Sequence, residues 1–570
     1  MSIASLLLKV NSPAQYVGGE VNATVSPGKH DAKKKIALAF PDLYHVGMSN
    51  LGLQILREVA NAVPDWSAER VFHPAPDMER ELRAAGLPLS SLESGTPLKF
   101  FDALGVSLAC ELHAAALPSL LDLGGVAPLA AERGDAAPIV IAGGHATFNP
   151  EIFADFVDAF AIGDGEEVLA EILRTLGGGA ASRRDKLTAL AQIPGVYVPS
   201  LYPTREAGGI VAPVLPAKIA RRVVADLDAA PVPLAPIVPL VETAHERVVL
   251  EIMRGCPNGC RFCQAGQINR PVRYRSVAVL LAHADAIYRA TGYDEIGLLS
   301  LSSSDYPHLE ELTTALDAKF APLGVGLSLP SLRVNRKLLD LPRRLQTVRK
   351  SGLTFAPEAG SERLRAVINK RVTNEDLLAG CEEAFRRGWR TVKLYFMLGL
   401  PTETDDDVLA IAELCNAAAG RRGKITCAVG NFIPKPFTPL QWCPMTAPEI
   451  LRARQQLLLR SVNRRAVDCK CHDIEVSVLE AALARGDRRL GKVILAAWQN
   501  GARLDNWSEH FNRAAWKKAF AENGLTPTEF AEREFSPDAV LPWSHLDAAN
   551  EDWLRREYAS AMDSELKVES

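Results

Sequence analysis

Three cysteines, Cys256, Cys260 and Cys263, are spaced closely enough to hold one metal centre. They lie in the segment Arg-Gly-Cys-Pro-Asn-Gly-Cys-Arg-Phe-Cys, which directly follows the apolar run at residues 248–253. A strand that leads into a tight loop with this C-x3-C-x2-C spacing brings the thiolates together, and thiolates favour an iron–sulfur cluster or zinc. A structural zinc site uses four protein ligands, but the next cysteine is Cys381. A 4Fe–4S cluster on three cysteines leaves one iron open for a small molecule. Zinc with a distant fourth ligand and a loop without metal are the alternatives.

This segment resembles the signature of the radical S-adenosylmethionine (SAM) superfamily, in which an aromatic residue, here Phe262, precedes the third cysteine. The resemblance implies that the amino and carboxylate groups of SAM chelate the open iron. It also implies that one electron from the cluster splits the sulfonium into methionine and a 5′-deoxyadenosyl radical, and that a reductant protein such as flavodoxin or ferredoxin supplies the electron. The protein's task in such chemistry is to position and shield the reactive cofactor.

The composition describes an ordinary globular protein without a membrane segment. At 570 residues the chain is too long for one compact core, so we expect two to four domains. The net charge of −4 gives no overall basic footprint for nucleic acid. No stretch approaches the roughly 20 apolar residues of a membrane span, and ten cysteines suit a reducing compartment. We therefore expect a cytoplasmic protein.

The first half of the chain alternates between strand-like and helical runs. After an extension at residues 1–33, the expected strands are 35–40, 104–108, 138–141 and 159–162, and the expected helices are 51–63, 77–85, 112–121 and 166–176. This alternation predicts a doubly wound α/β domain over residues 34–195, whose ligands bind at the carboxyl ends of the strands. A hairpin near 196–203 and a proline-rich linker occupy residues 196–245.

A second alternating pattern covers residues 246–445. Its expected strands are 248–253, 295–301, 326–329, 353–356, 390–396 and 425–432. Six strands with intervening helices predict an α/β fold of the partial (β/α)6 radical SAM barrel type, with the cysteine loop at the face where related barrels carry their chemistry. Residues 446–570 predict a helical C-terminal domain.

Polar residues follow the second of these strands. Ser302, Ser303, Ser304 and Asp305 offer hydroxyls and a carboxylate as acceptors for the ammonium group of SAM. The resemblance implies a Gly-Gly-Glu-like motif at this place, from which the serine-rich segment departs. The alternative is an ordinary helix cap made by Ser304 or Asp305.

Two later loops supply further candidates for SAM binding. Glu358 lies just beyond an apolar run, where a carboxylate must find a partner or water. The resemblance implies that a polar group here contacts SAM, and a cap or a salt bridge is the alternative. Asn369-Lys370 matches an Asn-Lys pair of related chains, with a solvated helix end as its alternative. Gly399 would let the backbone approach adenine closely.

The N-terminal domain resembles the cobalamin-binding module that precedes the barrel in one radical SAM subfamily. That module's signature is Asp-x-His-x-x-Gly, and here Tyr44 takes the histidine position. If cobalamin binds, we expect Tyr44 below the cobalt and the nucleotide tail near Ser107. A retained structural or substrate-docking layer without cobalamin is the alternative. The resemblance implies contacts from Asp42, Tyr44, Gly47, Ser107, Gly143 and Gly144.

The C-terminal region offers two weaker signals. Cys469 and Cys471, followed by His472, suggest a second metal site. We expect the two thiols to point opposite ways on an extended segment, and no further cysteine pair accompanies them, which disfavours this hypothesis. A run of arginines at residues 452–465 would suit RNA, and a solvated helix face is the alternative.

Over nearly its whole length the chain is similar to an uncharacterised family of radical SAM proteins with a cobalamin-binding-like domain. The segments that carry this similarity are residues 40–44, 91–95, 356–360 and 485–489. The similarity implies a radical SAM enzyme that acts on an unactivated carbon and methylates it where cobalamin is bound. The alternatives are cobalamin-free radical modification of RNA or protein, and an iron–sulfur scaffold that binds SAM without turnover.

Overall fold

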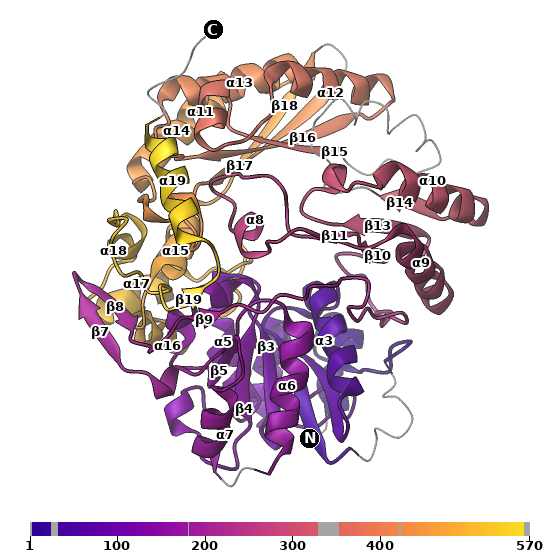
Figure 1. The fold of residues 1–570 in the computed structure, drawn as a ribbon, viewed down its shortest axis with the longest axis vertical. Coiled ribbons are helices and arrows are strands. Elements are labelled where there is room, and N and C mark those ends of the chain that lie inside the picture. The colour runs from indigo at the N-terminus through magenta and orange to yellow at the C-terminus, as the bar shows by residue number, and fades with distance from the viewer. Residues whose placement is uncertain (1–2, 24–31, 180–181, 329–352, 421–422, 564–570) are drawn as a thin grey trace.

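The computed structural model describes residues 3–23, 32–179, 182–328, 353–420 and 423–563. Figure 1 shows an N-terminal α/β unit, drawn in violet, below two further α/β layers, with the C-terminal helices in yellow along one side. No helix in these ranges has the length and apolar character needed to cross a membrane.

The N-terminal unit is built on a six-stranded sheet in the order β2-β1-β3-β4-β5-β6. The pairs from β2 to β5 are parallel, and β6 is antiparallel to β5. The doubly wound domain predicted from the sequence is therefore present. The strands are β1 (Lys34–Phe40), β2 (Trp66–Phe72), β3 (Ala103–Ser107), β4 (Ile139–Gly143), β5 (Ala159–Ala161) and β6 (Val196–Tyr197).

Helices cover both faces of this sheet. Ile36, Leu38 and Phe40 of β1 belong to one buried core, while Ala37 and Ala39 belong to another, because successive side chains of a strand point to opposite faces. The helices of this unit are α1 (Ile3–Leu7), α2 (Tyr44–Gly47), α3 (Leu51–Ala62), α4 (Pro76–Ala85), α5 (Ala116–Leu123), α6 (Gly165–Gly177) and α7 (Arg183–Leu190).

Two local predictions were wrong in this region. Strand β2 was missed because Glu69 and Arg70 interrupt its apolar pattern; both are buried and ion-paired in the structure. The hairpin predicted near residues 196–203 lies further along, between β7 (Thr204–Ala207) and β8 (Ile210–Pro213). Its turn is Gly208-Gly209, and both glycines have positive φ, as a tight hairpin turn requires.

The second half of the fold consists of two parallel sheets. β10 (Val248–Glu251), β13 (Glu295–Leu299) and β14 (Gly326–Ser328) form one of them. β15 (Leu353–Glu358), β16 (Thr391–Leu398), β17 (Lys424–Asn431) and β18 (Val467–Cys471) form the other. The six predicted strands are present, although residue 329 lies outside the described residues. β18 is an addition from the region predicted to be helical, and no closure of the two sheets into a barrel is seen in the described ranges.

The helices of this half alternate with its strands. They are α8 (Gln264–Ile268), α9 (Val277–Thr291), α10 (Leu309–Phe320), α11 (Glu362–Val367), α12 (Asn374–Arg386) and α13 (Asp405–Ala419). A short antiparallel pair, β11 (Met253–Arg254) and β12 (Arg273–Tyr274), joins the two ends of the segment that contains the cysteine loop and α8.

The C-terminal helices pack on both halves of the molecule, as Figure 1 shows. Arg488 pairs with the fully buried Glu151 of the N-terminal unit at 2.9 Å, and Asn149 donates to the carbonyl of Gly486 at 2.8 Å. This region therefore connects the two halves. Its elements are α14 (Pro448–Ser461), α15 (Ile474–Arg485), α16 (Leu490–Gln499), α17 (Arg513–Glu522), α18 (Pro527–Ala531) and α19 (Glu551–Met562), together with β19 (Leu546–Asp547), which pairs with β9 (Ile219–Ala220).

Candidate metal centre and cofactor cavity

The cysteine loop begins at a turn that requires glycine. Gly255 has a φ of 87°, and a Cβ there would lie 2.6 Å from the carbonyl oxygen of Asn269. Cys256, Cys260 and Cys263 follow as half-buried thiols. The Cys263 sulfur accepts from the backbone N–H of Gly266 at 3.3 Å, which caps α8. The loop is therefore shaped by local backbone contacts around its three thiols.

Arg261 holds this loop against distant parts of the chain. Its backbone N–H donates to the carbonyl of Ile368 at 3.0 Å. Its buried guanidinium donates to the carbonyl of Val367 at 2.7 Å and pairs with Glu557 of α19 at 2.9 Å. The position of the cysteines thus depends on the end of α11 and on the C-terminal helix.

Phe262, predicted to bind the cofactor, packs in an apolar cluster. Its neighbours in that cluster include Ala359, Leu400 and Phe432, from the carboxyl ends of β15, β16 and β17. The aromatic ring therefore joins the cysteine loop to the second sheet by burying apolar surface.

The serine-rich segment after β13 is hydrogen-bonded to the cysteine loop. Asn258 donates to the Asp305 carboxylate at 2.7 Å, and Ser302 donates to the same oxygen at 2.7 Å. The buried Ser303 hydroxyl lies 2.9 Å from that of Ser300, and Ser304 belongs to the same short turn. Helix α10 starts later, and its N-cap residue His308 makes no side-chain cap bond. The structure thus does not show Ser304 or Asp305 capping α10.

Glu358 ends β15 and lies near enough to Cys263 for its charge to act on that thiol. Its φ of 70° lies in the left-handed region, which is strained for a residue with a side chain. Burial raises the pKa of its carboxyl, although Lys370 pairs with it at 3.3 Å. Burial also raises the pKa of the Cys263 thiol to about 11, and Cys260, Cys256 and Glu358 act in the same direction. The structure therefore places Glu358, Cys256 and Cys260 in the neighbourhood of Cys263.

The Asn369-Lys370 pair also reaches this centre. Asn369 donates to the carbonyl of Gly259 in the cysteine loop at 2.9 Å, while Lys370 pairs with Glu358. These contacts answer the question that the sequence left open, because a solvated helix end would not make them.

The donor set fits an iron–sulfur cluster in its chemistry. Thiol side chains are the ligands that such clusters use, and a thiol with a raised pKa is ionised by the charge of the metal that it binds. In the part of the chain that the structure describes, no three His, Cys, Asp or Glu side chains converge closely enough for a single metal ion.

Gly399, predicted to approach adenine, makes a close contact with another element. Its φ is 84°, and a Cβ there would lie 2.8 Å from a methyl carbon of Leu451 in α14. Its N–H donates to Glu403 at 2.7 Å, and its carbonyl accepts from Thr446 at 3.0 Å. The packing of α14 therefore accounts for the glycine.

A cavity of about 460 Å³ lies where the two halves of the molecule meet. Ser107, Gly143 and Gly144, three of the residues predicted to contact cobalamin, line it at the carboxyl ends of β3 and β4. Leu38 and Val106 add an apolar wall. Other lining residues come from the second half: Glu251, Met253, Arg254, Gly255, Asn269, Leu299, Ser300 and Leu301. A ligand in this cavity would touch both halves.

His145 also lines this cavity and was not predicted as a site residue. Its Nε2 lies 3.5 Å from the side-chain nitrogen of Asn269. The surrounding cavity walls desolvate the imidazole and lower its pKa below the usual range. Its position directly after Gly143-Gly144 was the signal that could have identified it.

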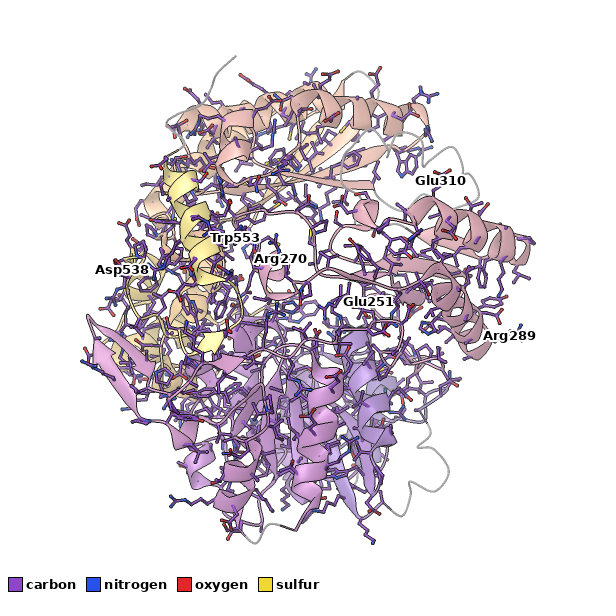
Figure 2. The ribbon with its side chains drawn as sticks, viewed as in Figure 1. Glu251, Arg270, Arg289, Glu310, Asp538 and Trp553 are labelled. Atoms are coloured by element: carbon purple, nitrogen blue, oxygen red, sulfur yellow. The ribbon has the colours of Figure 1, made fainter. Side chains whose placement is uncertain are left out.

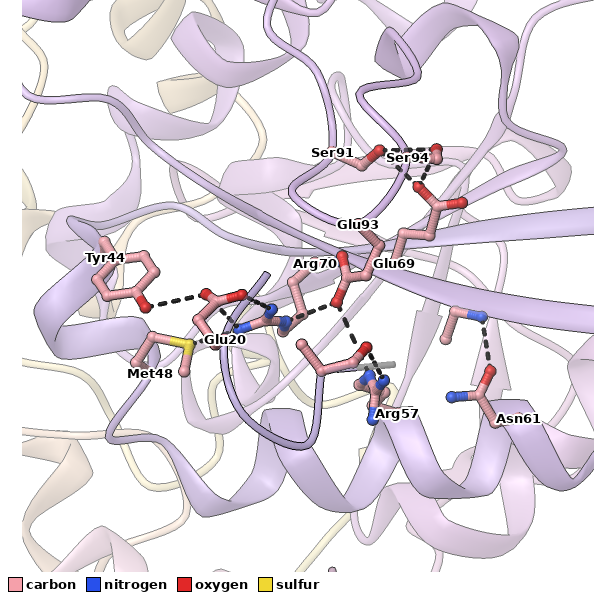
Figure 3. A network of polar contacts seen from close by, with 12 residues as sticks. Glu20, Tyr44, Met48, Arg57, Asn61, Glu69, Arg70, Ser91, Glu93 and Ser94 are labelled. Carbon is pink, nitrogen blue, oxygen red and sulfur yellow. Dashed lines mark hydrogen bonds and ion pairs between the residues drawn. The ribbon is translucent and has the colours of Figure 1, made fainter. Parts of the chain in front are cut away.

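Tyr44 lies outside the cavity, within the polar network shown in Figure 3. Its hydroxyl donates to Glu20 at 2.9 Å, and Glu20 pairs with the buried Arg70 at 2.8 Å. Arg70 also pairs with Glu93 at 2.7 Å. The structure therefore gives the Tyr44 hydroxyl a partner in this network rather than in the cavity.

Asp42 and Gly47 are likewise occupied by packing contacts. Asp42 accepts from the Trp507 indole N–H at 2.8 Å and from Asn506 at 2.6 Å. A Cβ on Gly47 would lie 2.3 Å from the ring of Phe72. The first of these motif residues connects the N-terminal unit to the C-terminal region, and the second allows α2 to pack on β2.

The expectation that Cys469 and Cys471 point opposite ways was wrong. Residues two apart on a strand share a face, and both thiols lie on the side of β18 that packs on the buried core. Cys469 is in register with Cys427 of β17, and the hydrogen bond between their thiols raises the pKa of Cys469 to about 12.

Within the run of arginines at residues 452–465, Arg454 pairs with the buried Glu403 at 2.8 Å.

The fold and the site define a two-part α/β protein with a three-cysteine loop beside a half-buried Glu–Lys pair. The family profile described as "Radical SAM proteins, N-terminal" matches residues 52–199, and that of the "Radical SAM superfamily" matches residues 250–415. Together they cover more than half of the chain. The chain belongs to the radical SAM superfamily of enzymes.

Two curated proteins are similar to this chain in sequence. The chain is 27% identical over 500 residues to "Uncharacterized protein MJ0966" of Methanocaldococcus jannaschii, an alignment that covers 85% of this chain and 98% of the relative. It is 24% identical over 295 residues to "Uncharacterized methyltransferase PH0819" of Pyrococcus horikoshii, covering 50% of this chain and 59% of the relative.

Two solved structures are similar in part. The radical SAM methyltransferase TsrM of Kitasatospora setae, with cobalamin and a [4Fe-4S] cluster bound, aligns with a TM-score of 0.49 and 14% identity over 72% of this chain and 74% of TsrM. The cobalamin-dependent radical enzyme OxsB, with aqua-cobalamin bound, aligns with a TM-score of 0.35 and 15% identity over 84% of this chain and 57% of OxsB.

The placement of Asp42 generates a test of its role. Replacing Asp42 with alanine should lower the free energy of unfolding by about 1–3 kcal/mol, because the buried carboxylate no longer accepts hydrogen bonds from Trp507 and Asn506. The shift can be measured as the midpoint of urea unfolding. The exposed Asp552→Ala is the matched control and should leave the midpoint unchanged. An unshifted midpoint in Asp42→Ala would contradict the packing role.

Proposed function

We propose that the protein holds a 4Fe–4S cluster on Cys256, Cys260 and Cys263 and uses it to cleave SAM reductively for a radical modification of an unactivated carbon. The observation that carries this proposal is that Cys256, Cys260 and Glu358 all lie near enough to Cys263 to act on its thiol, while Lys370 pairs with Glu358. When bound, the cluster and SAM supply a 5′-deoxyadenosyl radical that abstracts hydrogen.

The residues of this chain position the cofactor and shield it. Glu358 presents a buried carboxylate that can accept hydrogen bonds from SAM, and Lys370 offsets its charge. The Ser302–Asp305–Asn258 bonds hold a second polar edge beside the cysteine loop. Polar groups of this kind can bind an ionised ligand through charge-assisted hydrogen bonds, which are stronger than hydrogen bonds between neutral groups.

We propose further that the cavity between the two halves binds cobalamin and that the reaction is a methylation. Glycines and a serine line its wall at the carboxyl ends of parallel strands, where ligands of such sheets bind. His145 is a nitrogen donor on that wall, whereas Tyr44 is not near it. The methyltransferase name of the Pyrococcus horikoshii relative supports this outcome.

Two other functions remain in competition with methylation. A cobalamin-free modification of RNA or protein would use the same cysteine centre, with the cavity as a docking layer for the substrate. A scaffold that binds SAM without turnover would show no 5′-deoxyadenosine after anaerobic reduction. The formation of 5′-deoxyadenosine and methionine by reconstituted, reduced protein is therefore the experiment that separates an enzyme from a scaffold.

The cysteine assignment predicts a selective loss of iron. Replacing Cys263 with alanine should abolish SAM cleavage and lower the iron and sulfide content of anaerobically reconstituted protein, because one of three cluster ligands is removed. Cys469→Ala is the matched control and should keep the iron content and activity of the wild type. A Cys263→Ala protein with full iron content and an unchanged absorption spectrum would refute the assignment.

Glu358 is expected to contribute to SAM affinity. Glu358→Gln keeps the size of the side chain and removes its charge, so the loss of a charge-assisted hydrogen bond should weaken SAM binding by about 1.5–3 kcal/mol. Equilibrium binding of SAM to the reconstituted protein measures this change. The exposed Glu362→Gln should bind SAM as the wild type does. Unchanged affinity in Glu358→Gln would assign the carboxylate to a structural ion pair with Lys370.

The proposed cobalamin cavity predicts which substitutions should disturb the binding of a corrinoid. Ser107→Trp should abolish binding of hydroxocobalamin, because the indole fills space between the two halves. Tyr44→Phe should leave the affinity and the absorption spectrum of the bound corrinoid unchanged, because its hydroxyl is directed at Glu20. A spectral change in Tyr44→Phe, or full binding in Ser107→Trp, would place the corrinoid elsewhere.

A further inference from the structure

We propose that Cys110, His113 and Asp42 form a second reactive centre, in which the thiol of Cys110 is the nucleophile for an electrophilic carbon of a conjugated carbonyl compound. His113 is the base that takes the proton of the thiol, and Asp42 positions the imidazole. This centre lies in the N-terminal unit. It needs neither the cluster nor SAM, so it goes beyond the proposed radical chemistry.

The thiol and the imidazole are brought together by a short turn at the carboxyl end of β3. Cys110 is the extended N-cap residue of a 3-10 turn, Glu111–His113, and its carbonyl accepts from the backbone N–H of His113 at 3.3 Å. A turn of this kind places residues three apart on one side. Glu111 within the turn pairs with Lys435 at 2.8 Å, so the turn is also held from the second half of the molecule.

His113 is buried, with one ring nitrogen towards a carboxylate. The residue is 2% exposed, and its ring lies edge-on to that of Phe40, with 5.4 Å between the centroids. Its Nε2 lies 3.8 Å from Oδ2 of Asp42. Its Nδ1 makes no hydrogen bond with any residue that the structure describes. A ring that directs one nitrogen to a carboxylate has the other nitrogen left to exchange a proton with a nucleophile.

The charges of the three groups favour an ion pair between the thiol and the imidazole. Burial by itself would lower the pKa of His113, but Cys110 and Asp42 together raise it to about 9. Burial also opposes the ionisation of Asp42, yet His113 and Trp507 hold the pKa of that carboxyl below its usual range. A protonated imidazole between a carboxylate and a thiolate is the arrangement that activates a cysteine as a nucleophile.

The thiol lies beside the cavity between the two halves. Cys110 is half-buried and directly follows Ala109, an exposed residue that lines the cavity, as does Ser107 at the end of β3. Figure 2 shows Glu251, which lines the same cavity from the second half, at the boundary between the two halves. An electrophile held in this space would approach Cys110 along the carboxyl edge of the first sheet.

Addition to a conjugated carbonyl compound needs only the groups that are present. The proton of Cys110 moves to Nδ1 of His113, the sulfur forms a bond to the β-carbon, and the π electron pair of the C=C bond moves towards the carbonyl as an enolate. His113 then returns the proton to the α-carbon. One S–H bond and one C=C π bond are lost, one S–C bond and one C–H bond are formed, and no oxidant, reductant or leaving group takes part.

The test follows the reaction of single cysteines in the full-length protein, purified without oxygen. The probe is acrylamide, a small conjugated carbonyl compound, and mass spectrometry of each cysteine-containing peptide gives the rate of adduct formation. Cys469 is the internal control, because it is also half-buried but has thiols rather than an imidazole beside it. His113→Gln removes the base, and His283→Gln in α9 is the matched control in the second half.

We expect Cys110 of the wild type to react at least about tenfold faster than Cys469, because an imidazole holds its sulfur as a thiolate. His113→Gln should slow Cys110 by about tenfold or more and leave Cys469 unchanged, and His283→Gln should change neither rate. Rapid labelling of the fully buried Cys381 would reveal a variant that has lost its fold. In that case the ratio of the two rates in the wild type decides.

Three outcomes would overturn the proposal. Equal rates at Cys110 and Cys469 in the wild type would make Cys110 a packing residue at the edge of the core. An unchanged rate at Cys110 in a folded His113→Gln protein would show that His113 is not its base. A rate that falls equally at Cys110 and Cys469 in that variant would mark a general change in the fold rather than the loss of a base.

Discussion

The placement of the cysteine loop depends on one buried arginine. Arg261 lies between the second and third cysteines, and a buried guanidinium must satisfy its donors within the protein. It does so through the carbonyl of Val367 and the carboxylate of Glu557. A loop of otherwise local geometry is thereby tied to the end of α11 and to α19, so the C-terminal region helps to hold the cysteine loop in place.

The same C-terminal region also joins the two halves of the fold around the cavity. Trp507 and Arg488 bind buried carboxylates of the N-terminal unit, while Glu557 binds the cysteine loop. The carboxyl edge of the first sheet therefore faces the start of the second half across a shared cavity. This arrangement suits a reaction in which one bound group passes between two layers, as the proposed methylation requires.

Parts of the site were accessible from the sequence because their signals are local. The spacing of the three cysteines, the glycines at the carboxyl ends of strands and the strand–helix alternation all act over a few residues. Ser107, Gly143 and Gly144 were found in this way and do line the cavity. Glu358 was found as a carboxylate after an apolar run, and it lies near Cys263.

The sequence by itself determined the alternation of strands and helices in both halves, apart from β2 and β18, together with the cysteine loop and the superfamily. Only the tertiary structure decided which polar residues serve the cavity and which serve packing. Asp42 meets Trp507 across 465 positions of the chain, and the Tyr44 hydroxyl meets Glu20. Strand β2 was missed because its buried charges are paired with residues from other segments. Periodicity reports the face of an element, whereas the partner of a buried polar group depends on how distant segments come together.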